Sequence, residues 1–172
     1  LQYMAICDGI IIDVRNNGGG NLSNSSTLAS RFTNEKVLTG YIRHKTGKGH
    51  SDFSDPEPIY LEPSKQIRWQ KKVVVLTNRH AYSATNDFVN SMRYLPLVTT
   101  VGDQTGGGSG MPFSSELPNG WSVRYSASPH FDAEMNQIEF GIEPDVTVNM
   151  EKHDEDKGID TIIETARKLI KN

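Results

Sequence analysis

Two segments of this chain carry residue types that together could perform acyl transfer. One is a glycine turn, Gly18-Gly19-Gly20, which follows the apolar run of residues 9–14. The other is Ser83, a few residues after the apolar run of residues 73–78. A glycine turn leaves backbone N–H groups free to point at a negative oxygen, and a serine hydroxyl can attack a carbonyl carbon. If both runs are strands of one sheet, the turn and Ser83 meet at the same sheet edge.

Each segment also has a plainer interpretation. The glycine turn could be only a tight strand-to-helix connection, and its spacing fits neither a dinucleotide fingerprint nor a P-loop. Ser83 could be only the N-cap of the following helix. A serine also needs a base to become a nucleophile. His80 and His130 are expected to be surface or turn residues, which leaves no evident base in the chain.

The remaining polar candidates are assigned to structure. Asp13 and Arg15 are expected to pair locally or cap the glycine turn, and Asp145 to accept hydrogen bonds from backbone amides. His130 with Asp132 and neighbouring acids could hold a metal only loosely, and no H-E-x-x-H spacing occurs. We therefore expect neither a metal nor a cofactor.

The hydrophobic pattern predicts the elements that would position these residues. It indicates strands buried on both faces at residues 9–14 and 72–77, further strands at 37–44 and 97–101, and a hairpin turn at 117–121. Apolar residues at helical spacing predict helices after Gly20, after Ser83, and over residues 159–170. Residues 45–64 are rich in Gly, Ser, Asp and Pro, which predicts a long exposed excursion. Together these elements predict an α/β layer fold with an additional antiparallel portion.

Composition places the chain among ordinary globular domains. The 172 residues are 35% hydrophobic and 23% charged, enough for one domain with a sizeable core. The net charge of −3 argues against a general nucleic-acid binder. The single cysteine, Cys7, excludes an internal disulfide and is expected to pack beside the first strand. No apolar run reaches the ~18 residues of a membrane span. Because the chain starts at Leu1, almost directly in a core strand, we expect a C-terminal fragment of a longer chain.

Four segments, in this order along the chain, resemble the tail-specific or C-terminal processing serine peptidases. They span nearly the whole sequence: GIIIDVRNNGGG at 9–20, VLTNRHAYSA at 75–84, VGDQTGGG at 101–108, and IEFGIEPDV at 138–146. The resemblance implies a ClpP/crotonase-like α/β core with a mixed sheet and flanking helices, and residues 1–172 forming one peptidase catalytic core domain.

The resemblance also implies roles for individual residues. Ser83 matches the family nucleophile, and Ala84 and Gly19 match the residues whose amides hold the oxyanion. The position of the lysine base of the bacterial enzymes falls on Gly108, so a Ser–Lys dyad is not available. This departure makes the chain more similar to the tricorn-core and interphotoreceptor retinoid-binding branch. That branch implies a histidine base upstream of Leu1, supported by Glu139, with Glu143 as second choice.

Three functions remain open on these grounds. The leading hypothesis is a serine endopeptidase acting on unstructured polypeptides or protein tails. The alternative is a catalytically inactive domain of the same fold that binds a peptide or another ligand. A crotonase-like acyl-CoA enzyme ranks last, because it has no use for Ser83. The resemblance further implies an extracytoplasmic location, in the periplasm or cell envelope, and leaves homo-oligomerisation open.

Overall fold

The computed structural model describes residues 1–171. Its strands are β1 (Gly9–Asp13), β2 (Val37–Ile42), β3 (Glu57–Leu61), β4 (Lys72–Thr77), β5 (Val98–Gly102), β6 (Phe113–Glu116), β7 (Ser122–Tyr125), β8 (His130–Phe131) and β9 (Val146–Thr147). Its helices are α1 (Leu22–Ala29), α2 (Ala84–Arg93), α3 (Lys152–Glu155) and α4 (Thr161–Lys171), with short 3-10 turns η1 (Gln2–Met4) and η2 (Ser30–Phe32). Parallel and antiparallel strands with flanking helices confirm the predicted α/β class.

The centre of the fold is a parallel sheet in the order β1-β4-β5-β9. Strand β4 lies inside the sheet with helices on both faces, and every residue after its first is buried, as a continuous apolar run predicts. The prediction that β1 is buried on both faces holds in part. Ile10 and Ile12 pack on the α2 side of the sheet and Ile11 on the α4 side, but the strand lies at the sheet edge and Ile10 is its one buried residue.

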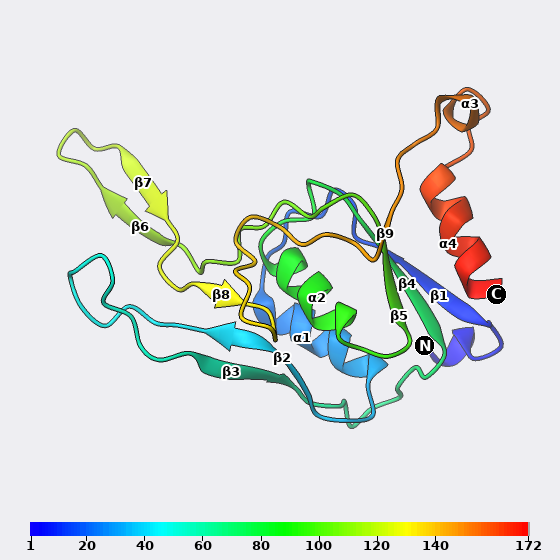
Figure 1. The fold of residues 1–172 in the computed structure, drawn as a ribbon, viewed down its shortest axis with the longest axis horizontal. Helices are drawn as coiled ribbons and strands as arrows, with labels where there is room; N and C mark the ends of the chain where they lie inside the picture. The colour runs from blue at the N-terminus through cyan, green and yellow to red at the C-terminus, as the bar shows by residue number, and fades with distance from the viewer. Residues whose placement is uncertain (172) are drawn as a thin grey trace.

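Helices cover the two faces of this sheet (Figure 1). Val73 and Val75 point to the face that packs against α2, in a cluster that includes Phe88. Val74 and Leu76 point the opposite way, into a cluster beneath α4. The alternation follows from the two-residue period of a strand. The alternation places α2 on one face of the sheet. The first residue of α2 then lies near the carboxyl end of β4.

A second, antiparallel sheet has the order β3-β2-β8 and covers the far side of α2. Strand β3 lies within the segment predicted to be an exposed excursion. The predicted exposure is confirmed for all its residues but Leu61, whereas the expected lack of regular structure is wrong over Glu57–Leu61. Strands β6 and β7 pair only with each other and form a hairpin that extends away from the body (Figure 1).

An ion-pair cluster joins the end of β1 to the start of α4. The Arg15 guanidinium donates to both Asp13 carboxylate oxygens, at 2.9 and 2.7 Å, and lies 2.9 Å from Asp160 Oδ2. Hydrogen bonds from Arg15 hold the pKa of Asp13 below its usual 3.8. Partial burial alone would raise the pKa of Asp160, but donation from Arg15 and two helix amides lowers it. The predicted local pairing of Asp13 with Arg15 is therefore confirmed.

Two smaller expectations have opposite outcomes. Asp145 Oδ2 accepts from the Thr100 amide at 2.7 Å and its hydroxyl at 2.8 Å, which confirms the predicted structural role. Cys7 is exposed, so the prediction that it packs beside the first strand is wrong.

Candidate active site

Ser83 begins α2 in a backbone conformation that side-chain-bearing residues seldom adopt. Its φ is 57° and its ψ −127°, and its side chain makes no capping hydrogen bond to the helix. Such a conformation costs about 1–3 kcal/mol and persists only where the surroundings hold it. Here the Ser83 amide donates to Gly107 O at 2.7 Å. The N-cap interpretation therefore does not describe this serine, because it occupies the cap position without capping.

The glycine turn lies directly against Ser83. A Cβ added at Gly19 would lie 2.5 Å from Tyr82 O, 2.7 Å from Ala84 N and 2.9 Å from Ser83 Cβ, so only glycine fits. The φ of Gly19 is +92°, which also favours glycine. The structure thus brings together the two segments that the sequence placed at one sheet edge.

Asn17 holds the turn in this position. Its backbone oxygen accepts from the Tyr82 amide at 3.0 Å, and its Oδ1 accepts from the Gly19 amide at 3.0 Å and from Thr85 Oγ1 at 2.9 Å. These bonds tie the end of β1 to the start of α2. Sequence reasoning gave Asn17 no role, and its place immediately before three glycines was the available signal.

Three amides near Ser83 keep their donors free. Within residues 1–171, none of the Gly18, Gly20 and Ala84 N–H groups donates to a protein acceptor. The Ala84 amide lies in the first turn of α2, where the helix dipole favours negative charge. The Gly19 amide, by contrast, is bonded to the Asn17 side chain.

The loop of residues 105–110 lies on the other side of Ser83. Gly108, the position that would carry a lysine in the bacterial enzymes, has φ +79°, and a Cβ there would overlap the ring of Tyr82. Glycine is thus built into the packing at this position. Tyr82 occupies the space through which a lysine side chain would leave the backbone.

A buried amide fixes this loop to α2. Asn86 is fully buried; its Nδ2 donates to Ser109 Oγ at 2.8 Å and to Ile138 O at 3.0 Å, and its Oδ1 accepts from Thr105 Oγ1. Thr105 Oγ1 in turn accepts from the Ile142 amide at 2.7 Å. Sequence reasoning missed Asn86, although a polar residue three positions before Val89, on the same face of an amphipathic helix, was a usable signal.

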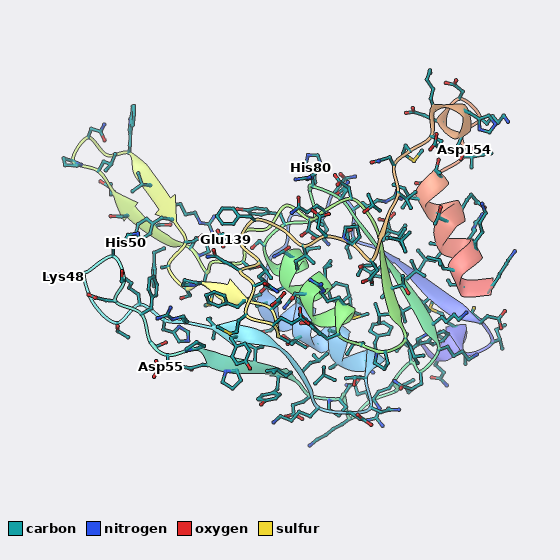
Figure 2. All side chains as sticks on the ribbon, viewed as in Figure 1. Lys48, His50, Asp55, His80, Glu139 and Asp154 are labelled. Carbon is teal, nitrogen blue, oxygen red and sulfur yellow. The ribbon has the colours of Figure 1, made fainter. Side chains whose placement is uncertain are left out.

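Glu139 follows Ile138 and lies at the base of the β6–β7 hairpin (Figure 2). Its backbone oxygen accepts from the Gly108 amide at 2.8 Å, and its Oε1 accepts from Ser126 Oγ at 2.6 Å. Its Oε2 is buried and has no partner among the described residues. A buried carboxylate oxygen without a donor is costly, so this atom is available to a further donor. Glu143, the second choice, is exposed.

Ser83 opens onto a cavity of about 560 Å³. The lining residues come from the glycine turn, the start of α2, the 105–110 loop and the hairpin base: Gly18, Gly19, Gly20, Tyr82, Ser83, Gly108, Pro112, Arg124, Tyr125 and Ser126. Ser126, the partner of Glu139, is among them. A cavity of this size can hold several residues of an extended peptide.

The histidines of the chain lie elsewhere. His80 is exposed, as predicted, and His50 lies on the loop between β2 and β3, away from α2 (Figure 2). The expectation that His130 is a surface or turn residue is wrong. It is 4% exposed in β8, and its Nδ1 lies 2.9 Å from Asp87 Oδ1. Asp87 is 43 residues away in sequence, so a local reading could not find this pair.

Neither of two other site types is found in the part of the chain that the structure describes. No group of three or more His, Cys, Asp or Glu side chains is arranged to hold a metal ion. No helix within residues 1–171 combines the length and apolar character needed to cross a bilayer.

The fold and the strained turn at Ser83 are those of a serine-peptidase type of domain. The model of peptidase family S41 matches residues 1–148, and the chain therefore belongs to this family. Among curated proteins, the tricorn protease of Thermoplasma acidophilum is 28% identical over 164 residues. That alignment covers 92% of this chain and 14% of the tricorn protease.

Solved structures agree with this assignment. A candidate peptidase from Parabacteroides merdae is 58% identical, with a TM-score of 0.95, over 98% of this chain and 54% of that chain. The photosystem II D1 C-terminal processing protease has the same fold at 21% identity and a TM-score of 0.63, over 83% of this chain and 35% of that one. These matches confirm the predicted fold class and family.

Proposed function

We propose that this domain hydrolyses peptide bonds in unstructured polypeptides, with Ser83 as the nucleophile. The observation that carries the proposal is the strained backbone of Ser83. The Ser83 hydroxyl makes no capping hydrogen bond to α2. It faces a cavity that the glycine turn lines. Strain of this kind is found at functional sites, and membership of family S41 supports the same role.

The reaction follows from the groups around Ser83. The hydroxyl oxygen attacks the substrate carbonyl carbon, and the carbonyl oxygen becomes an oxyanion. The Ala84 amide donates to that oxygen from the first turn of α2. We assign the second donor to Gly19, whose backbone lies against both Ala84 N and Ser83 Cβ. Its N–H then exchanges Asn17 Oδ1 for the oxyanion.

The base in this proposal is a histidine contributed by a segment that precedes Leu1, oriented by Glu139. The support is the buried, unpartnered Oε2 of Glu139, which can accept an imidazole N–H. The histidine takes the Ser83 proton during attack. When the tetrahedral intermediate collapses, the C–N bond breaks, the histidine gives this proton to the leaving amine, and an acyl group stays on Ser83. Water, deprotonated by the same histidine, then attacks this ester, and Ser83 takes the proton back as the product carboxylate departs. In this scheme Ser126 holds the other oxygen of Glu139 at 2.6 Å and so sets the direction of the carboxylate.

Labelling with a fluorophosphonate probe tests the nucleophile. The experiment uses the longest natural chain that contains these residues and compares it with its Ser83→Ala variant. Labelling that is lost in the variant establishes an activated serine. A folded parent that remains unlabelled refutes the proposal. Glu139→Gln, which keeps the size of the side chain, is expected to slow labelling, because the amide can no longer stabilise an imidazolium.

A second candidate is a binding domain that keeps the fold without catalysis. It is favoured by one observation: no lysine or histidine is among the residues that line the Ser83 cavity. A folded, unlabelled parent that binds extended peptides would support it.

We further propose an extracytoplasmic location, which fractionation of expressing cells tests. Whether the protein self-associates is decided by measuring its mass in solution.

A further inference from the structure

The cavity beside Ser83 has one charged residue in its lining, Arg124. This arginine lies on β7, opposite Ser114 of β6, near the base of the hairpin. The other lining residues are glycine, proline, serine and tyrosine. Among the residues that line the cavity, Arg124 is therefore the one that presents a charge to a substrate.

The Arg124 guanidinium is free to bind a ligand. Within residues 1–171 it makes no ion pair and no hydrogen bond. By contrast, Arg15, Arg79 and Arg167 each have a carboxylate partner within 3.2 Å. Glu116 is on the same hairpin face as Arg124, but the two do not pair.

Glu139, which is bonded to the lining residue Ser126, forms no ion pair with Arg124. Glu139 accepts from Ser126 with one oxygen, and its other oxygen is buried. An unpaired guanidinium offers a planar fork of donors that matches a carboxylate with two parallel hydrogen bonds. Its charge also attracts acidic groups into the cavity.

We propose that Arg124 is a specificity-determining residue that selects substrates with a carboxylate close to the scissile bond. This inference rests on the proposed function of Ser83. A volume of 560 Å³ corresponds to a sphere roughly 10 Å across, and an extended peptide advances about 3.3 Å per residue. The carboxylate therefore lies within about three residues of the scissile bond. It is either an acidic side chain or the carboxylate at the end of the chain.

The test compares matched peptides with the longest natural chain that contains these residues. The fluorogenic peptides are otherwise neutral and come in pairs. The two members of a pair carry Glu or Gln at one of the three positions on either side of the cleaved bond. A second pair differs only in a free or amidated C-terminus. For each variant the readout is the ratio of kcat/KM values within a pair, which cancels changes in basal rate. The variants are Arg124→Gln and Arg124→Glu, with Lys168→Gln as the control.

Lys168 is a matched control because its change also removes one positive charge from an exposed residue. It lies on α4, at the opposite end of the molecule from the hairpin (Figure 1). Thermal melts confirm that each variant is folded before its ratio is measured.

We expect the parent to prefer the acidic peptide about three- to tenfold at one position, a range typical of a partly exposed arginine–carboxylate pair. Arg124→Gln brings the ratio close to one, Arg124→Glu reverses it in favour of the uncharged peptide of the pair, and Lys168→Gln leaves it unchanged. A preference for the free C-terminus alone identifies the chain end as the source, and one for Glu identifies an acidic side chain. If the parent cleaves the peptides without either preference, the role of Arg124 is refuted and the proposed function of Ser83 stands. If the folded parent is not labelled by the fluorophosphonate probe, the proposed function is refuted as well.

Discussion

Neighbouring glycines in the turn beside Ser83 should respond very differently to alanine. An alanine Cβ at position 19 would lie 2.5 Å from Tyr82 O and 2.7 Å from Ala84 N, at φ +92°. At position 18 it would meet nothing within 4 Å, and the backbone is not in the left-handed region. Gly18→Ala is thus a control one residue away.

The magnitude follows from two separate costs. A positive φ costs a residue with a side chain about 1–3 kcal/mol, and overlap with fixed backbone atoms costs about 1–3 kcal/mol more. Gly19→Ala should therefore lower the free energy of unfolding by about 2–6 kcal/mol, and Tm by roughly 4–24 °C for a chain of this size. Gly18→Ala should stay within about 0.5 kcal/mol of the parent.

Activity separates the steric argument from the catalytic one. Thermal melts give the stability of both variants, and fluorophosphonate labelling is then timed at a temperature where both are folded. Alanine keeps the backbone N–H, but its Cβ would push the turn away from Tyr82 O and Ala84 N and so move this N–H out of reach of the oxyanion. Loss of one oxyanion donor costs about 10²–10³ in rate, so Gly19→Ala should label at least about 100-fold more slowly. Equal melting temperatures for the two variants would refute the steric reasoning. A folded Gly19→Ala that labels at the parental rate would refute the placement of the oxyanion.

Three further predictions concern groups around the site. Ser83→Gly should melt a few degrees above Ser83→Ala, because glycine accepts φ 57° without strain, and calorimetry of the two variants checks this. Arg15→Gln should lower the free energy of unfolding by about 0.5–1 kcal/mol at pH 7. Because the pKa values of Asp13 and Asp160 are lower in the folded state, this stabilisation is complete above pH 3.8 and lost as the pH falls through the folded-state values. Urea titrations of parent and Arg15→Gln should therefore converge in acid, and a constant difference would contradict the ion-pair account. Asn86→Ala should cost about 2–4 kcal/mol, since it leaves buried partners without bonds, and a loss below about 1 kcal/mol would show that the loop does not depend on it.

The sequence predicted the elements whose pattern is local. Residues 72–77 form β4 with the predicted bounds, because a run of valines between polar residues is typical of a central parallel strand. Strand β3 was missed: it is short, mostly exposed and contains Pro58. Proline is tolerated there because β3 is at a sheet edge. An edge strand of this kind has almost no apolar alternation to detect.

The candidate site was partly predictable for the same reason. Ser83 and the glycine turn were found because each follows a recognisable strand and both strands are neighbours in one sheet. The pair of His130 with Asp87 was not found, because it depends on a contact between β8 and α2 that no local pattern encodes. For Asn17, the position before three glycines was a signal, but its three accepted hydrogen bonds depend on contacts with Tyr82 and Thr85 that no local pattern encodes.

The packing of Tyr82 over Gly108 has an evolutionary consequence. A single substitution that placed a lysine at position 108 would overlap the tyrosine ring and strain a backbone at φ +79°. Tyr82 would have to become smaller or turn away first, and that step alone brings no benefit while position 108 is glycine. The two positions are thus coupled by epistasis, so that neither change is expected to introduce a working lysine at position 108 without the other.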